Sequence, residues 1–213
     1  MIKITKKSRA LDLIEPPYLA SLASLLWIAL YYLPVGGALL RLILPLPIAL
    51  LHIRRGTKVA FEGIIIQILL LLILMGPVRG PLFLFPYGTL SFWLGWCWLK
   101  NKNWWFSLFS GILIGTSGFL IRVLAISILV GENLWIVVTR ASYGLIQKLT
   151  SIIDISWSPS ITLIQLVAIF LVIFQELVYV LTIHIIAYAV FPRLKSSIPQ
   201  PPNTISGFVD LRL

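Results

Sequence analysis

The sequence predicts an all-α fold, a polytopic transmembrane helical bundle of six spans with both termini in the cytoplasm. Three observations predict it. Hydrophobic residues make up 59% of the 213-residue chain and charged residues only 11%, whereas about a quarter of a soluble domain is charged. Apolar runs close to the length of a membrane span recur along the chain. Short basic clusters separate these runs, and such clusters orient membrane proteins.

Six apolar segments have about the length of a spanning helix, which needs roughly 20 residues and somewhat fewer where the bilayer adapts. We expect these spans at residues 17–33, 38–53, 59–75, 81–99, 104–130 and 160–191. Pro45 and Pro47 lie inside the second segment and predict a kink or partial unwinding there. Gly76 and Pro77 close the third segment, and Pro192 ends the last one.

The basic residues predict the orientation of the bundle. With six spans, one side carries the clusters Lys3–Arg9, Arg54–Lys58, Lys100–Lys102 and Arg193–Lys195. The other side keeps only the scattered basic residues Arg41, Arg79, Arg140 and Lys148. This asymmetry predicts a basic cytoplasmic N-terminus (1–16), a transmembrane domain (17–192) and a cytoplasmic tail rich in proline (193–213).

The segment 133–153 differs from an ordinary loop. Apolar residues recur in it at helical spacing, with polar residues between them: Leu134, Val138, Ala141, Leu145, Leu149 and Ile152. We therefore expect an amphipathic helix on the outer face of the membrane. It either shields lipid as a surface helix or covers an outward-facing pocket as a lid.

Several classes of function are disfavoured. The net charge of +10 is spread over short clusters between spans and does not form a basic block of the kind that tracks nucleic acid. A single cysteine, Cys97, excludes an internal disulfide, and two histidines without a nearby cysteine or carboxylate pattern do not predict a metal site or a cofactor. The chain carries no motif of a hydrolase, protease or nucleotide-binding enzyme, so we do not expect an enzyme.

Polar side chains inside apolar spans are costly and are therefore candidates for function. The candidates for ligand binding are Arg122, Gln165, Gln175 and Glu176 in the last two spans, with Trp135 at the outer segment. If the last helix projects outward, Arg122 and Glu176 reach a similar depth and could pair or contact a ligand. Alternatively, Arg122 extends toward the outer interface and Glu176 sits in a hydrated seam or is protonated.

The fifth span also carries a stripe of small residues. Gly111, Gly115 and Gly118 follow one another at helical spacing, with serine and threonine between them. Small residues permit close helix packing, so the stripe predicts a helix–helix contact before it predicts a ligand contact.

Several stretches are similar in sequence to segments of a known family, among them LMGPVRGPLFLFPYG, GTSGFLIRVLAISILVGENLW and SPSITLIQ. They resemble the YybS-like family of membrane proteins, in its cyanobacterial and chloroplast branch, over residues 18–202. That family is distantly similar to the S components of energy-coupling-factor transporters.

The resemblance implies a six-helix bundle that binds a vitamin or a metal near its outer face. It also implies a membrane coupling subunit and two ATPases as partners. S components present an AxxxA pattern on the first helix to the coupling subunit. Here the nearest match is Ala20 with Ser24.

Two classes of function follow for this chain, in the plasma (inner) membrane or the thylakoid membrane. The first is a subunit that binds a small solute, similar to a vitamin or a metal, for a transporter. The second is a structural or assembly subunit, without catalysis, that docks in a larger membrane complex. An outward cavity lined by Arg122 and Glu176 would favour the first class, and a solid core with these charges facing lipid or a partner would favour the second.

Overall fold

The computed structural model describes residues 6–33, 36–152, 159–196 and 198–202. In this part of the chain every regular element is a helix. The α-helices are α1 (Lys6–Tyr32), α2 (Gly37–Ile43), α3 (Leu46–Arg55), α4 (Thr57–Arg79), α5 (Thr89–Leu99), α6 (Trp104–Val130), α7 (Trp135–Ile152) and α8 (Ile161–Val190). Short helical turns at η1 (Pro81–Phe83), η2 (Leu84–Gly88) and η3 (Pro192–Leu194) connect them. The helical bundle expected from the sequence is therefore confirmed.

Five segments are long and apolar enough to cross a membrane: Leu13–Tyr32, Thr57–Arg79, Pro81–Leu99, Trp104–Val130 and Ile161–Val190. They correspond to five of the six spans expected from the sequence. The first helix begins at Lys6 rather than at Pro17, so part of the expected N-terminal segment continues the first span as a helix. Residues 1–5 of that segment and residues 203–213 of the expected tail lie outside the described residues.

The remaining expected span, at 38–53, is divided into α2 and α3. The break lies at Leu44 and Pro45, and Pro45 caps α3, as the prolines of this segment suggest. The two helices have 7 and 10 residues, so together they extend over about 26 Å at 1.5 Å per residue. Every residue of α3 from Leu46 to His52 is buried, because α1, α4 and α5 pack around this helix. The α3 half of the second segment thus lies at the centre of the bundle, whereas α2 is partly exposed.

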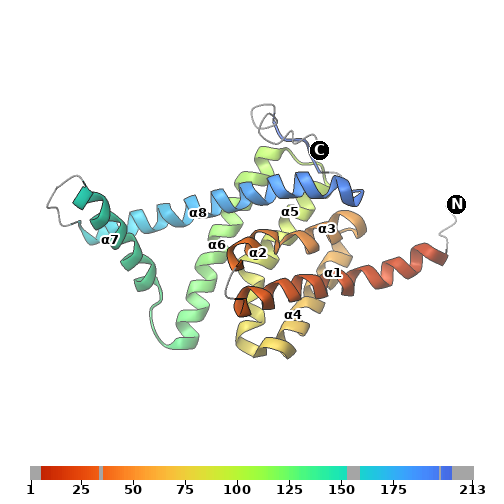
Figure 1. The fold of residues 1–213 in the computed structure, drawn as a ribbon, viewed down its shortest axis with the longest axis horizontal. Coiled ribbons are helices and arrows are strands. Elements are labelled where there is room, and N and C mark those ends of the chain that lie inside the picture. The colour runs from red at the N-terminus through yellow and green to blue at the C-terminus, as the bar shows by residue number, and fades with distance from the viewer. Residues whose placement is uncertain (1–5, 34–35, 153–158, 197, 203–213) are drawn as a thin grey trace.

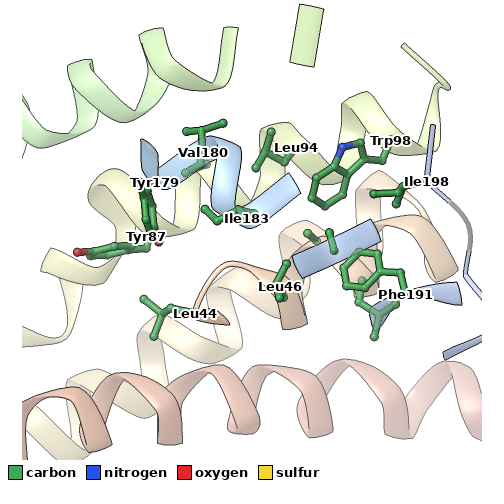
Figure 2. Close-up of a cluster of buried hydrophobic side chains, with 14 of the residues drawn as sticks. Leu44, Leu46, Tyr87, Leu94, Trp98, Tyr179, Val180, Ile183, Phe191 and Ile198 are labelled. Carbon is green, nitrogen blue, oxygen red and sulfur yellow. The ribbon is translucent and has the colours of Figure 1, made fainter. Parts of the chain in front are cut away.

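The core contains many large side chains. Trp27, Phe83, Tyr87 and Trp98 are all at most 2% exposed and come from three different parts of the chain. Figure 2 shows Tyr87 and Tyr179 beside one another at one end of this cluster, with Trp98 and Phe191 toward the other. The edge-on and tilted contacts among these rings place the aromatic side chains where α1, α5, α8 and the η turns meet.

The glycine stripe of α6 lies against other elements. A Cβ atom at Gly111 would contact Val180, one at Gly115 would meet the Glu176 carboxylate at 2.4 Å, and one at Gly118 would meet Pro86 at 2.7 Å. These glycines therefore let α6 approach α8 and η2 closely, which is the packing role expected for them.

The ends of several elements meet at one end of the bundle. Arg54 Nη1 and Arg55 Nε each donate to the Glu15 carboxylate over 2.6 Å. Arg54 also donates to Ser196 Oγ over 3.2 Å and to the Leu194 carbonyl. These contacts join the first half of α1, the end of α3 and the chain after α8. Two of the basic regions predicted to be cytoplasmic, at the end of α3 and after α8, thus lie close together, and we call the opposite end of the bundle the outer end.

Helix α7 lies beyond the outer end. Figure 1 shows α7 crossing the first turns of α8, away from the helices of the core, with a connecting segment that leads to it from the end of α6. It packs mainly against α8, and its buried residues are Ser142 and Ile146. Apolar residues such as Ile136, Val137 and Leu149 are more than half exposed. Helix α7 occupies most of the segment expected to be amphipathic, 133–153; Asn133 and Leu134 precede it, and residue 153 lies outside the described residues.

Candidate functional site

A hollow of about 500 Å³ lies at the outer end, between α1, α2, η2 and α6. Most of its lining is apolar or aromatic, and two arginines complete it: Leu30, Tyr31, Gly37, Arg41, Tyr87, Phe119, Arg122, Val123 and Ile126. Small-molecule sites are typically hollows of about 300–1,000 Å³ with a few polar groups among apolar walls. We call this the arginine hollow.

Aromatic rings hold Arg122. Its guanidinium lies 5.4 Å from the centre of the Trp27 ring and 5.7 Å from that of Tyr87. Arg122 Nη2 also donates to the Tyr31 hydroxyl over 3.2 Å. A ring face attracts a cation by about 0.5–2 kcal/mol, which is less than a carboxylate in a good ion pair provides in a poorly hydrated place. The rings thus position the charge of Arg122 without neutralising it.

Arg41, from α2, shares the Tyr87 ring with Arg122. Its guanidinium lies 5.6 Å from the Tyr87 centre and 5.9 Å from the Tyr179 centre. The Arg41 backbone carbonyl accepts a hydrogen bond of 2.9 Å from the Tyr179 hydroxyl, which fixes α2 against α8. Arg41 Nε is buried and has no hydrogen-bond partner in the described part of the chain. Tyr87 therefore contacts two guanidinium groups, and one of them has an unused buried donor.

Glu176 lies behind this aromatic cluster. Its side chain is 1% exposed and packs against Gly115 of α6, where the absence of a side chain leaves room for the carboxylate. Its Oε2 atom has no hydrogen-bond partner among the described residues, and Arg41 is the cation within electrostatic reach. Arg41, Arg122 and Glu176 are all within electrostatic reach of Tyr87. Tyr87 therefore links the three ionisable side chains.

The described ion pairs do not join Arg122 to Glu176, which the sequence suggested as one possibility. The register of α6 against α8 explains the separation. Glu176 packs at the level of Gly115, and Arg122 follows Gly115 by seven residues, about 10 Å farther along α6. The sequence estimate placed both side chains at one depth because it assumed that the outer turns of α8 project beyond α6.

The other candidate residues lie in different places. Gln175 is exposed and lines a second hollow of about 530 Å³, which shares Arg41 and Tyr179 with the surroundings of Glu176. Trp135 lines a third hollow, beside the last turns of α6. Gln165 is exposed on α8, eleven residues or about 16 Å before Glu176. The structure therefore groups Arg122, Glu176 and Gln175 around Arg41 and leaves Trp135 and Gln165 apart.

Sequence reasoning missed the residues that link this group. Arg41 was counted only among the scattered outer charges, although an arginine inside an expected span is itself a candidate. Tyr31, Tyr87 and Tyr179 gave no signal, because tyrosine is common at membrane interfaces. No residue of α7 lines the arginine hollow, so α7 does not cover this hollow as a lid.

The histidines and the small-residue pair of α1 lie away from the hollow. His184 contacts Ser107 and the Val180 carbonyl, each at 2.8 Å, and His52 contacts Thr57 at 3.0 Å. The described residues contain no cluster of three or more His, Cys, Asp or Glu side chains that could hold a metal. Ala20 is fully buried and Ser24 is 2% exposed, so this pair faces the interior of the bundle.

Comparison with known proteins adds one match. The family model described as "Predicted membrane protein (DUF2232)" matches residues 21–204, which include every helix from α2 to α8 and the C-terminal part of α1. Neither a curated protein nor a solved structure matches the chain.

Proposed function

Because the chain belongs to the DUF2232 family of predicted membrane proteins, we propose a function inside the bilayer: it binds a small solute in the arginine hollow, as the binding subunit of a transporter. The family and the apolar helices make it an integral membrane protein. The solute and the transport role are our proposal, supported by the geometry of the hollow and by the resemblance to S components.

One observation carries the proposal. Arg41 and Arg122 come from two separate helices, line one hollow, and are held by aromatic rings rather than by carboxylates. An ionisable group inside a membrane protein is expensive, and a purely structural arginine is normally satisfied by a counter-ion or by backbone carbonyls. Among the described residues Arg122 forms no ion pair, and Arg41 has only the electrostatic interaction with the single Glu176 carboxylate. This excess of arginine is better explained if a ligand completes the site.

The resemblance implies either a vitamin or a metal as the solute, and the positive charge of the hollow distinguishes between them. Two guanidinium groups repel a metal cation and leave it with the single carboxylate of Glu176. A vitamin-like organic molecule is compatible with the aromatic and apolar walls. We therefore propose an organic solute rather than a metal.

A coupling subunit and ATPases are part of the proposal only through the resemblance. In that arrangement the coupling subunit would dock on another surface than the Ala20–Ser24 pair, because α4 and the other neighbours of α1 already cover these residues. The membrane would be the plasma (inner) membrane or the thylakoid membrane.

A structural or assembly subunit is the second candidate, and the outer arm formed by α6, α7 and α8 favours it. This arm presents many exposed apolar side chains, including Leu124, Ile128, Val137, Leu166 and Phe170. Lipid can cover such a surface, and so can the helices of a larger complex.

Purification of the tagged protein from its native membrane in mild detergent separates the two candidates. Mass spectrometry would identify the bound proteins and small molecules. We expect a stoichiometric organic solute, with or without ATPase subunits. Recovery within a large complex, with no solute bound, would contradict the binding role and support the assembly role.

A further inference from the structure

The basic side chains at the outer end converge on one aromatic cluster. Besides Arg41 and Arg122, the guanidinium of Arg79 at the end of α4 lies 5.8 Å from the centre of the Tyr31 ring. The same Tyr31 accepts the hydrogen bond from Arg122 through its hydroxyl. Three arginines from α2, α4 and α6 therefore gather on the linked rings of Trp27, Tyr31 and Tyr87.

The negative charge nearby is smaller. Among the described residues, Glu176 is the carboxylate within electrostatic reach of Tyr87. Glu15 is engaged with Arg54 and Arg55 at the opposite end of the bundle. Three cations against one carboxylate leave this region positive, and positive potential in a hollow concentrates anions.

The hydrogen-bond donors of the arginines are also in excess. A guanidinium has five N–H groups in a planar fork that matches a carboxylate or a phosphate. Arg122 gives one hydrogen bond to Tyr31, and Arg41 has a buried Nε without a partner in the described chain. Bidentate, charge-assisted hydrogen bonds to an oxyanion would use these donors, whereas a neutral solute would leave most of them unsatisfied.

We propose that the arginine hollow takes an organic oxyanion, whose carboxylate or phosphate group binds between the Arg41 and Arg122 guanidinium groups. Arg79 adds positive charge near the edge of the site. The apolar part of the ligand lies along Leu30, Phe119 and Ile126. This inference rests on the proposed solute-binding function and names the chemical class of the solute.

The test uses the full chain in nanodiscs of phosphatidylcholine, with inorganic phosphate as the probe and chloride at equal ionic strength as the reference. A ligand that binds only the folded state raises the unfolding midpoint. We expect phosphate to raise the midpoint of the wild-type protein by a few degrees in a saturable way. Arg41→Gln and Arg122→Gln should each weaken the apparent affinity roughly tenfold or more, because each removes a charge-assisted contact.

Two further variants keep the result interpretable. Arg140→Gln removes an exposed cation of α7 outside the hollow and should respond to phosphate as the wild type does. Arg122→Lys keeps the charge but loses the fork, so an intermediate response is expected even if Arg122→Gln folds poorly. No phosphate response in the wild type, or equal responses in the wild type and both Gln variants, would overturn the proposal.

The oxyanion could belong to a free solute or to a lipid headgroup, and a second nanodisc distinguishes the two. If phosphatidylglycerol alone stabilises the wild type but not the Arg variants, and phosphate then adds nothing, the oxyanion comes from lipid. If the phosphate response persists in phosphatidylglycerol, the site takes a solute. A neutral or cationic compound that co-purifies with the wild type and is lost from Arg122→Gln would contradict the oxyanion while leaving solute binding intact.

Discussion

Tyr87 is the residue on which the charged groups of the candidate site converge. Its ring lies within 6 Å of the Arg41 and Arg122 guanidinium groups and packs against Trp27, at 5.4 Å between ring centres. The side chain is 2% exposed, so water does not replace these contacts. Since each cation–ring contact contributes about 0.5–2 kcal/mol, the Tyr87 ring helps to hold two cations in one small region, together with the other rings around them.

We therefore expect Tyr87→Leu to lower the free energy of unfolding by about 1–3 kcal/mol and to weaken solute binding, because both ring contacts are lost. Tyr87→Phe keeps the ring face and should behave much more like the wild type. Thermal unfolding and solute occupancy in detergent would measure both effects. Equal losses of stability and of solute occupancy in the two variants would mean that the Tyr87 hydroxyl, and not the ring face, makes the important contact.

Gly115 offers a second residue-scale prediction. A methyl group there would lie 2.4 Å from Glu176 Oε2, so Gly115→Ala must displace the buried carboxylate and should cost about 1–3 kcal/mol of stability. Gly144→Ala is the matched control, because nothing lies within 4 Å of its added methyl group. In the helix α7 that change should be neutral or stabilising by up to about 1 kcal/mol. Similar unfolding midpoints for both variants would contradict the packing of Glu176 against α6.

At the scale of elements, the long helices were predictable and their packing was not. The apolar runs located α6 and α8 almost to the residue, because a spanning helix needs a continuous apolar surface. The prolines indicated the break before α3, but not that α3 is buried on all sides. Periodicity along one helix does not state which helices surround it.

The candidate site was predictable in part for the same reason. Arg122 and Glu176 stood out as charges within apolar runs. Their separation depends on the register of α6 against α8, which Gly111 and Gly115 set by close contact with Val180 and Glu176. That register is a property of two helices together. The role of Arg41 was missed because its helix is short and its charge was assigned to the outer face.

The contact between α1, α3 and the chain after α8 gives an element-scale prediction. Glu15→Gln removes the partner of Arg54 and Arg55, whose side chains are 32% and 22% exposed. The loss should be about 1–3 kcal/mol, with faster hydrogen exchange in the first turns of α1. Glu62→Gln is the control, because Glu62 is exposed on α4 and forms no ion pair among the described contacts. Matching exchange in both variants would show that Glu15 does not hold α1 in place.

For the whole molecule, the charge asymmetry predicts the orientation in the membrane. Arg54, Arg55 and the chain around Lys195 meet at one end, and the arginine hollow lies at the other. If the basic end is cytoplasmic, the hollow opens toward the outer side, where an imported solute would arrive.

Cysteine labelling tests this orientation. In a Cys97→Ser background, a membrane-impermeant reagent added outside intact cells should label Glu132→Cys, which follows α6 at the outer end, and not Asn101→Cys, between α5 and α6. Both positions are exposed, so access depends on the side of the membrane. The reverse labelling pattern would invert the topology and place the hollow in the cytoplasmic half.

The central claim, that the arginine hollow binds a solute, is tested most directly by native mass spectrometry of the protein purified from its own membrane. The measurement would compare the wild type with Arg122→Ala. Arg140→Ala would serve as the control, because it also removes a cation at the outer end. The account predicts a bound small molecule in the wild type and in Arg140→Ala, and its loss from Arg122→Ala, which should still insert and fold. The same occupancy in all three proteins, or no bound molecule in the wild type, would contradict it.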